Sequence, residues 1–471
     1  MRIEKTKIIA TIGPAVDSEK ALEKMMLSGM NVARLNFSHG SHDEHKERIR
    51  RIRKVSEALN HPVAILQDLR GPKIRIGPIP EPGMELKPGQ TVVLTPGDVS
   101  TLNDEIIVTH KHLSRDVKRH DRLLLADGLL ELVVESIDGK RIFCKVVIGG
   151  LLTSNKGITL PSGSFKVPAT TKKDLEDLAF GLAEAIDYVA LSFVRSAKDI
   201  LSIREFIKKK QGHVKTPVIA KIEKHEALDN IDQILAVSDG IMVARGDLGV
   251  EIPLENVPGI QKMLVKKANA LGKPVIIATQ MLRSMVDSPR PTRAEAADVA
   301  NAVLDGADAV MLSEETAIGN FPVEAVRYMR RITRQTEKYF PHETYLKLIP
   351  GTEVSESTAY AACVLADHLE AGAIIATTKT GFTAKQISKF RPKTNILAVS
   401  PDAVTVRALS LYWGCIPTLI EKKKTTDAMI ATVKKTAIES GIVSSGENIV
   451  ITAGYPLWVA GTTNIIQVDT V

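Results

Sequence analysis

Residues 217–249 read PVIAKIEKHEALDNIDQILAVSDGIMVARGDLG. This stretch contains two short apolar runs, PVIAKIE (217–223) and DGIMVARGDLG (239–249), and both end in charged residues. Near-continuous apolar strands that alternate with helical segments are typical of a parallel sheet buried on both faces. The same alternation recurs in six further runs, KIIATIG (7–13), NVARLNFSH (31–39), PVAILQDLR (62–70), DYVALSFV (187–194), PVIIATQM (274–281) and ADAVMLSEETA (307–317).

Eight such units predict an α/β fold built on a (β/α)8 TIM barrel. Helix starts are supported by two capping-box patterns, Ser41 with Glu44 and Thr292 with Glu295. Two doubly wound sheets are the competing fold, and we favour the closed barrel because eight strands is the number that it requires.

Two regions fall outside the barrel pattern. Residues 71–167 contain short strand-like runs broken by Gly, Pro and Asp, which predict a small inserted all-β domain in a βα loop. Such a domain is expected to act as a lid over the site, although a passive insertion is the alternative. Barrel segments 1–70 and 168–342 then flank the insert. Residues 343–471 contain five apolar runs alternating with helices, which predict a C-terminal open α/β domain.

The composition is that of an ordinary soluble globular protein, with 44% hydrophobic and 25% charged residues in a chain of 471. The net charge of +7 is spread along the chain, so nucleic acid is not an expected partner. No run is long enough for a membrane span and no secretory signal is recognised. Three widely spaced cysteines, Cys144, Cys363 and Cys415, fit a reducing compartment, and we expect a cytoplasmic protein.

Polar residues stand at alternate positions where the apolar runs end. Side chains at i and i+2 on a strand share a face, so these sets are expected to gather at the C-terminal mouth, where barrel enzymes place their chemistry. Any single pair is more often a solvated ion pair, and the argument depends on several strands delivering charge to one place. The sets are Arg34, Asn36 and Ser38; Asp68 and Arg70; Lys221 and Glu223; Arg245 and Asp247; Ser313 and Glu315; and Thr279 alone.

These residue types indicate a phosphoryl-transfer site. Glu223 and Asp247 come from adjacent strands, and two neighbouring carboxylates without a His or Cys partner favour Mg²⁺ or Mn²⁺. Lys221 supplies a point charge beside them, while Arg34 and Arg75 supply guanidinium groups suited to phosphate. The chain has neither a GxxxxGK(S/T) loop nor the HRD and DFG motifs, so it belongs to neither of the two common kinase frameworks.

The chain resembles the pyruvate kinase family. The resemblance is carried by NVARLNFSHG, QDLRGPKIRIG, KIEKHEAL, MVARGDLGVEIP, ATQML and SPRPTRAEAADVANAVLDGADAVMLSEETA, and it covers essentially the whole chain. It implies transfer of phosphate from phosphoenolpyruvate to ADP, giving pyruvate and ATP in the last step of glycolysis. It also implies a divalent metal, a homotetramer and a phosphorylated allosteric effector.

The resemblance also assigns roles. Lys221 matches the lysine that neutralises the transferred phosphoryl group and the enolate. Thr279 and Ser313 match residues beside the proton relay to the methylene carbon, with a water held by their hydroxyls as the expected donor. The remaining matches are Glu223 and Asp247 as metal ligands; Arg34, Ala244, Arg245, Gly246, Asp247 and Thr279 around the substrate; Arg75 on phosphate; and Asn36, His39, Arg75 and Lys173 on the nucleotide side.

One departure from the family pattern concerns potassium. Many relatives bind K⁺ through residues that match Asn36, Ser38 and Asp68, together with a threonine and a nearby glutamate. Here those last two positions are Leu69 and Lys73. An ammonium group at Lys73 can replace the charge of K⁺, so activity without K⁺ is expected. The alternative is that Lys73 is an ordinary solvated lysine.

The C-terminal domain contains a candidate anion site. Thr378, Thr380, Gly381 and Thr383 follow an apolar run and precede a helical segment, so their hydroxyl and N–H groups can form a phosphate nest. A simple helix cap is an equally good interpretation. In the family the matching loop binds the phosphate of an effector, and the loop 454–464 with Trp458 is its expected partner.

Two other functions stay open. One is a Mg²⁺-dependent aldolase or lyase acting on pyruvate or phosphoenolpyruvate, in which Lys221 forms a Schiff base. The other is a metabolite-binding regulator without turnover, which the presence of both carboxylates, Lys221 and Thr279 argues against.

Overall fold

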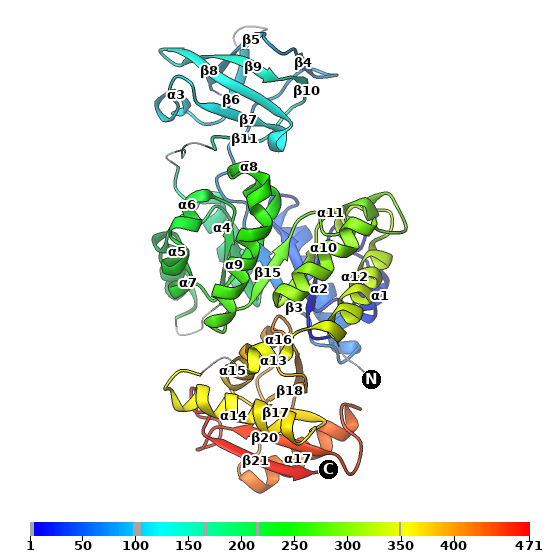
Figure 1. Ribbon diagram of the computed structural model, residues 1–471. Helices are drawn as coiled ribbons and strands as arrows, with labels where there is room; N and C mark the ends of the chain where they lie inside the picture. The colour runs from blue at the N-terminus through cyan, green and yellow to red at the C-terminus, as the bar shows by residue number, and fades with distance from the viewer. Residues whose placement is uncertain are drawn as a thin grey trace.

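The computed structural model describes residues 4–97, 105–161, 163, 165, 167–212, 216–347 and 350–471. It forms three bodies in a row, with an inserted domain at one end, a barrel in the middle and a C-terminal domain at the other end (Figure 1). The barrel is closed and all of its strand pairs are parallel. Its strands, in spatial order, are β1 (Lys7–Thr11), β16 (Ala309–Leu312), β15 (Val275–Ala278), β14 (Gly240–Ala244), β13 (Val218–Ile222), β12 (Tyr188–Leu191), β3 (Ala64–Asp68) and β2 (Val32–Asn36).

The predicted barrel is therefore confirmed, and each of the eight apolar runs contains one strand. Both capping boxes are formed as well, at Ser41 with Glu44 and at Thr292 with Glu295. The barrel helices are α1 (Glu19–Ser28), α2 (His42–Ala58), α4 (Lys172–Ala183), α5 (Ala197–Gln211), α6 (His225–Asp229), α7 (Ile231–Val237), α8 (Arg245–Glu251), α9 (Val257–Ala270), α10 (Arg293–Asp305), α11 (Glu314–Ala317) and α12 (Pro322–Thr336), with 3₁₀ turns η2 (Leu254–Asn256), η3 (Arg283–Val286) and η4 (Glu337–Tyr339).

Two of the predicted strands are too long. The run 239–249 is a strand only to Ala244, and α8 begins at Arg245. The run 307–317 likewise ends as a strand at Leu312, and α11 begins at Glu314. The idea that these runs present alternate residues on a strand face is therefore wrong beyond Ala244 and Leu312.

The inserted domain leaves the barrel between β3 and α4 and is built almost entirely of strands. A six-stranded sheet has the order β11-β7-β8-β9-β5-β6, and β4 pairs with β10 beside it. A continuous apolar core runs through the domain and includes Leu94, Leu132 and Cys144. The elements are β4 (Met84–Leu86), β5 (Thr91–Pro96), β6 (Glu105–Val108), α3 (Leu113–Asp116), β7 (Arg122–Leu125), η1 (Ala126–Gly128), β8 (Leu130–Asp138), β9 (Arg141–Ile148), β10 (Gly150–Leu152) and β11 (Ile158–Thr159).

The C-terminal domain is an open five-stranded sheet of order β19-β18-β17-β20-β21, in which only β21 is antiparallel to its neighbour. All five expected strands are present. The elements are α13 (His342–Leu346), α14 (Val354–His368), β17 (Ala373–Thr377), α15 (Phe382–Lys389), β18 (Asn395–Ser400), α16 (Ala403–Leu409), β19 (Cys415–Leu419), α17 (Thr426–Glu439), β20 (Asn448–Ala453) and β21 (Ile465–Thr470).

The C-terminal domain closes the N-terminal end of the barrel. Leu411 belongs to the apolar cluster of the barrel interior, and the Tyr188 hydroxyl at the start of β12 donates to the carbonyl of Ala408 at 2.6 Å. Lys7, at the start of β1, donates to the carbonyl of Cys415 at 2.7 Å. The opposite, C-terminal end of the barrel faces the inserted domain (Figure 1).

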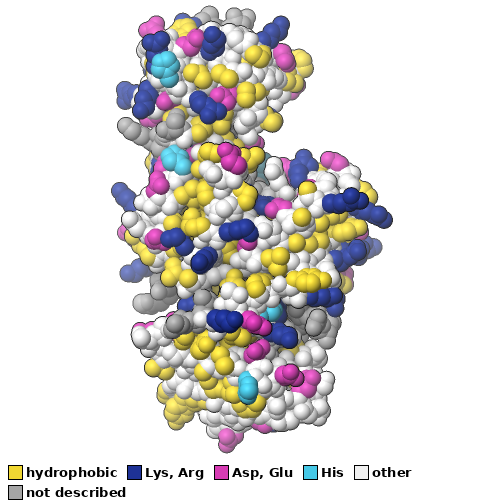
Figure 2. All heavy atoms as spheres, viewed as in Figure 1, with side chains coloured by type: hydrophobic (Ala, Val, Ile, Leu, Met, Phe, Trp, Pro, Cys, Tyr) yellow, Lys and Arg dark blue, Asp and Glu magenta, His cyan; other side chains and the backbone are white. Residues whose placement is uncertain are grey.

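The face shown in Figure 2 carries basic and acidic side chains interspersed over all three bodies. Among the described residues, no helix is long and apolar enough to cross a bilayer.

Candidate active site

Lys221 lies at the centre of the charged cluster at the barrel mouth. Its ammonium group contacts the Glu223 carboxylate at 2.8 Å and the Asp68 carboxylate at 3.2 Å, and it donates to the Ser192 hydroxyl at 2.7 Å. Burial opposes the charged form, but Asp68 and Glu223 outweigh it and raise the pKa of Lys221 above its ordinary value. Lys221 is therefore a permanently charged ammonium group at neutral pH.

Arg34 extends the cluster across β2 and β3. Its guanidinium group contacts the Asp68 carboxylate at 2.7 Å and donates to the Thr11 hydroxyl at 2.9 Å. Burial works against ionisation of Asp68, yet Lys221 and Arg34 hold its pKa below the usual value. One buried carboxylate thus fixes two cationic groups at the mouth.

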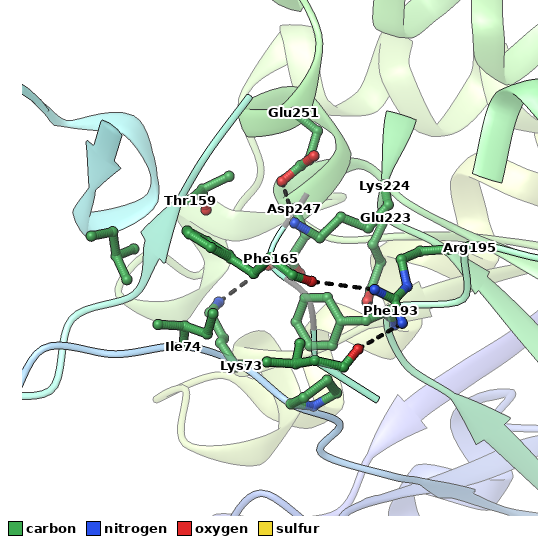
Figure 3. Close-up of a pocket in the computed structure, with 13 residues that line it drawn as sticks. Lys73, Ile74, Thr159, Phe165, Phe193, Arg195, Glu223, Lys224, Asp247 and Glu251 are labelled. Atoms are coloured by element: carbon green, nitrogen blue, oxygen red, sulfur yellow. Dashed lines mark hydrogen bonds and ion pairs between the residues drawn. The ribbon is translucent and has the colours of Figure 1, made fainter. Parts of the chain in front are cut away.

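The two predicted metal ligands lie on the wall of a pocket between the barrel mouth and the inserted domain. Glu223 follows β13, and Asp247 stands in the first turn of α8 (Figure 3). Burial raises the pKa of Glu223, and the charge of Asp247 acts in the same direction while Lys221 opposes both. The two carboxylates therefore interact electrostatically, as expected of carboxylates that can share a cation.

This donor set fits a hard divalent cation. The Glu223 side chain accepts the backbone N–H of Phe193 at 2.8 Å, which fixes its orientation, and Asp247 is about one-third exposed to the pocket. Carboxylate oxygens are the ligands that Mg²⁺ and Mn²⁺ prefer. Glu223 and Asp247 are thus able to hold such an ion.

Lys73 closes the pocket from the inserted side. Its ammonium group contacts the Asp247 carboxylate at 3.1 Å (Figure 3). It also contacts the Asp127 carboxylate at 3.5 Å. Burial opposes the charged form, but Asp247 and Asp127 raise the pKa of Lys73. The side chain is only 28% exposed and is not a freely solvated lysine. Lys73 connects the barrel to the η1 turn of the inserted domain.

The other residues of the potassium pattern lie at the ends of β2 and β3. The Asn36 side-chain carbonyl accepts the backbone N–H of Ser38 at 3.1 Å, and Asp68 is committed to its two cations. The Leu69 side chain packs in the apolar layer between the barrel and its helices, while its carbonyl accepts the Ser192 hydroxyl at 2.7 Å. Leu69 therefore offers the site no polar side chain.

Thr279 follows β15 in a strained backbone conformation. Its φ is 73° and that of Gln280 is 57°, and such left-handed non-glycine residues cluster at functional sites. The Thr279 hydroxyl donates to the Ala278 carbonyl at 2.6 Å and accepts the backbone N–H of Gly246 at 2.7 Å. The hydroxyl thereby ties the end of β15 to the turn after β14.

Arg245 supports this loop from behind. Its guanidinium group contacts the Asp298 carboxylate at 2.7 Å and donates to the Thr279 carbonyl at 2.9 Å. The side chain is thus committed to the barrel wall. Ser313 stands at the end of the next strand, and its backbone N–H donates to the buried Glu315 carboxylate at 2.7 Å.

Arg75 lies where the chain enters the inserted domain. Its guanidinium group donates to the Asn155 carbonyl at 2.9 Å. Burial and the charge of Arg70 lower the pKa of Arg75, while Asp127 and Asp247 act in the opposite sense. Arg75 therefore lies within electrostatic reach of the metal-ligand wall.

The predicted nucleotide side lies around the N-termini of α2 and α4. Lys173 contacts the buried Asp177 carboxylate at 2.7 Å, and His42 contacts the same carboxylate at 2.7 Å. The exposed His39 accepts a hydrogen bond on its carbonyl from the ring of His45 at 2.9 Å. The contacts of His39 and Lys173 are thus with α2 and α4, not with the Lys221 cluster.

Two residues outside the predicted set, Ser192 and Thr11, contact the charged cluster. Ser192 and Thr11 follow or end apolar runs in the same way as the predicted residues, and they bind Lys221 and Arg34. Their strand-end position is the signal that could have found them. Arg195 has no such signal in the sequence. Its guanidinium group donates to the carbonyls of Phe165 and Val167, which lie where the chain returns from the inserted domain, and only the fold brings these residues together (Figure 3).

The threonine-rich loop of the C-terminal domain faces the loop predicted to partner it. Thr378, Thr380 and Thr383 line a small pocket together with residues 454 and 457–462, including Trp458. Gly381 is the N-cap residue of α15, with φ 83°, and the Thr383 and Thr463 hydroxyls lie 2.8 Å apart. The two loops therefore form one site-like concavity.

Comparisons with known proteins agree with this architecture. The family model "Pyruvate kinase, barrel domain" matches residues 3–326, and "Pyruvate kinase, alpha/beta domain" matches residues 356–469. The chain is 45% identical to the pyruvate kinase of Clostridium acetobutylicum, with both chains covered in full. It is 47% identical to that of Staphylococcus saprophyticus and 46% identical to that of Staphylococcus aureus, over all of this chain and 81% of each relative. A barrel mouth of paired charges, an inserted β domain and matches along nearly the whole length lead to one assignment: the chain belongs to the pyruvate kinase family.

Proposed function

We propose that the chain transfers the phosphoryl group of phosphoenolpyruvate to ADP at the barrel mouth, giving pyruvate and ATP. The observation that carries this proposal is the buried ammonium group of Lys221, held between Asp68 and Glu223, while Glu223 and Asp247 line the same pocket. Catalysis of phosphoryl transfer is mostly positioning and charge neutralisation, and this cluster supplies both. A lactate-dehydrogenase-coupled assay tests the activity directly.

Lys221 stabilises charge rather than forming a covalent bond. Its pKa lies above the ordinary value because Asp68 and Glu223 surround it, so the amine is not a nucleophile at neutral pH. It is instead suited to neutralise the phosphoryl group in transit and the enolate that remains. Borohydride trapping with pyruvate distinguishes this role from an aldolase or lyase, for which a reduced adduct on Lys221 is expected.

Glu223 and Asp247 would hold the divalent ion, Mg²⁺ or Mn²⁺. When bound, the ion supplies Lewis-acid stabilisation of phosphoryl and enolate oxygens. The protein prepares for it by fixing Glu223 through the Phe193 N–H at 2.8 Å. Arg34 and Arg75 would then orient phosphate groups from either side.

Thr279 orients the proton donor rather than acting as the donor. Its own hydroxyl proton is committed to the Ala278 carbonyl, and one of its acceptor positions is taken by the Gly246 N–H. A threonine oxygen has a second lone pair, which can accept a hydrogen bond from water. We therefore assign the donor role to a water held by Thr279 and Ser313, which directly follow the neighbouring strands β15 and β16.

Activity is expected not to need K⁺. Leu69 offers no polar side chain, and Lys73 brings a fixed positive charge to within 3.1 Å of Asp247. Turnover in buffer free of K⁺ and Na⁺ is expected to rise less than tenfold on adding K⁺, and a larger activation would contradict this proposal. Lys73→Met is expected to lower turnover at least tenfold, whereas Lys87→Met, at an exposed position of the inserted domain, is the matched control.

Regulation is proposed to act through the loop 378–383, with a phosphorylated effector as ligand. Trp458 lines the same pocket and is partly exposed, whereas Trp413 is fully buried, so a change in tryptophan emission on effector binding reports Trp458. Thr380→Ala is expected to weaken that change, and an unaltered titration would contradict the site. The working assembly is proposed to be a homotetramer in the cytoplasm, where the three buried free cysteines stay reduced.

A further inference from the structure

A histidine and two glutamates converge beside the candidate active site, where α6 meets α8. His225 is the first residue of α6, Glu226 follows it, and Glu251 is the last residue of α8. Their ligand atoms, one imidazole nitrogen and two carboxylate oxygens, all lie within 4.8 Å of one another. Glu251 also lines the pocket that Glu223 and Asp247 line. None of the three converging side chains takes part in the proposed phosphoryl transfer.

The His225 ring directs its Nδ1 atom at both carboxylates. Nδ1 lies 3.1 Å from the Oε2 atom of Glu251 and 3.4 Å from the Oε2 atom of Glu226. A ring nitrogen carries at most one proton, and Glu251 is its hydrogen-bond partner. The Oε2 atom of Glu226 is buried and, within the described part of the chain, accepts no hydrogen bond. A buried carboxylate oxygen without a donor is costly, and a cation shared with Nδ1 would remove that cost.

The distances suit a tetrahedral metal ion. Zn²⁺ binds imidazole nitrogen and carboxylate oxygen at about 2.0–2.2 Å, which places neighbouring ligand atoms of a tetrahedron about 3.3–3.6 Å apart. The two separations from Nδ1, 3.1 and 3.4 Å, are close to this range. The two carboxylate oxygens lie within 4.8 Å of each other. Glu226, at 21% exposed against 2% for Glu251, is the side chain that would turn toward the ion.

Lys224 prepares Glu251 for binding a metal. Its ammonium group contacts the Oε1 atom of Glu251 at 2.5 Å, which leaves Oε2 to face His225 (Figure 3). An outer partner of this kind fixes the orientation of a metal-binding carboxylate. Two carboxylates and one ammonium group leave one net negative charge beside a neutral imidazole, and this charge favours a cation. The His225 side chain is 31% exposed, so an ion can reach it from solvent.

We propose that His225, Glu226 and Glu251 bind a divalent transition-metal ion, with Zn²⁺ as the expected ion and water as its fourth ligand. The imidazole nitrogen distinguishes this site from that of Glu223 and Asp247, because Mg²⁺ prefers oxygen ligands whereas Zn²⁺ accepts nitrogen and oxygen together. The competing interpretation is an ion-pair cluster in which a charged His225 serves both carboxylates. That interpretation predicts no bound metal.

An ion at this position would join two segments of the candidate active site. His225 stands two residues after Glu223, and Glu251 lies about one helical turn beyond Asp247 on α8. Zn²⁺ would therefore fasten α8 to the start of α6. Because the folded state would bind the ion more tightly than the unfolded chain, Zn²⁺ is expected to raise the melting temperature.

Equilibrium dialysis of the full chain against Zn²⁺, with excess Mg²⁺ to occupy the site of Glu223 and Asp247, tests the proposal through binding rather than turnover. The wild type is expected to bind one more Zn²⁺ per chain than His225→Gln, which keeps a polar side chain but lacks the imidazole. Glu226→Gln is expected to weaken the binding of that ion at least tenfold. His368→Gln, at an exposed histidine that ends α14, is the matched control and should bind as the wild type does. Equal Zn²⁺ binding by the wild type and His225→Gln would overturn the proposal.

A measurement on the wild type does not depend on how a variant folds. Co²⁺ in a tetrahedral site with an imidazole ligand absorbs visible light strongly, whereas octahedral Co²⁺ with oxygen ligands absorbs weakly. Co²⁺ is expected to give the strong band, which Zn²⁺ abolishes and Mg²⁺ leaves in place. A weak spectrum alone, or a strong band that Mg²⁺ abolishes, would overturn the proposal. The rise in melting temperature with Zn²⁺ should be absent from His225→Gln, and an equal rise in both proteins would count against the site.

Discussion

Replacing Lys221 by Met removes the charge on which the active-site assignment depends. Methionine keeps the length and apolar stem of the side chain while deleting the ammonium group. In the wild type this group contacts Asp68 at 3.2 Å and Glu223 at 2.8 Å, and both carboxylates are at most 2% exposed. The substitution therefore leaves buried negative charge without one of its partners.

The magnitude follows from the remaining contacts. Breaking a buried ion pair costs about 3–5 kcal/mol, and we expect the lower end because Arg34 still contacts Asp68 at 2.7 Å. A loss of about 3 kcal/mol changes the unfolding equilibrium constant roughly 160-fold. Loss of one preorganised group at the developing charge lowers kcat by about 10²–10³. Binding of Mn²⁺ is expected to change little, since Glu223 and Asp247 remain.

The three quantities, kcat, stability and Mn²⁺ binding, are measured separately. The lactate-dehydrogenase-coupled assay gives kcat, urea unfolding gives stability, and the electron paramagnetic resonance signal of free Mn²⁺ gives metal binding. Lys267→Met is the control, because it breaks an exposed pair with Asp232 and should cost at most about 1 kcal/mol. A kcat within tenfold of the wild type in Lys221→Met would refute the role assigned to Lys221.

Three further predictions concern other contacts. Thr292→Ala removes the capping box with Glu295 and should cost about 1 kcal/mol in thermal unfolding with kcat unchanged; an unchanged melting temperature would contradict it. Asp68 has its folded pKa held below the ordinary 3.8 by its two cationic neighbours, so the stability it contributes is present above that pH and is lost as pH falls through the folded pKa. In urea unfolding, Asp68→Asn should accordingly be less stable than the wild type at pH 7. Between pH 5 and pH 3 it should lose less stability than the wild type loses, and parallel pH profiles of the two proteins would contradict this prediction. Arg391→Met leaves the Asp308 carboxylate buried without its ion-pair partner, and it should lower the free energy of unfolding in urea by about 3–5 kcal/mol. A loss below about 1 kcal/mol would contradict a stabilising role for the pair.

The barrel was predictable because its signal is repeated eight times. A strand that is buried on both faces needs apolar side chains at consecutive positions, and this pattern is visible in each run by itself. The ends of the runs were less predictable. ARGDLG and SEETA continue the apolar runs 239–249 and 307–317, yet the chain turns into α8 and α11 there. Acidic residues in a first helical turn, such as Asp247 and Glu315, stabilise that turn, and this effect competes with strand extension.

The sequence pattern predicted where several charged residues would lie, but not how they would pair. The strand-end pattern holds for Lys221 and Glu223, whereas Asp247 reaches the same pocket as Glu223 from the first turn of α8. It did not show that the Arg245 side chain turns away to Asp298, because side-chain direction after a strand end depends on the packing of the following helix. Contacts such as that of Lys73 with Asp127 join residues 54 positions apart, and only the folded inserted domain brings them together.

The pairings show how the mouth is balanced before any ligand arrives. Each of its carboxylates contacts a cationic side chain of the same chain, so neither the carboxylates nor the cations carry a large uncompensated charge. A divalent cation alone or a multiply charged anion alone would disturb this balance, whereas the two together disturb it less. The physical consequence is that metal and phosphorylated substrate should each raise the affinity for the other by the same factor. The contacts that set this balance are Arg34 and Lys221 with Asp68, Lys221 with Glu223, and Lys73 with Asp247.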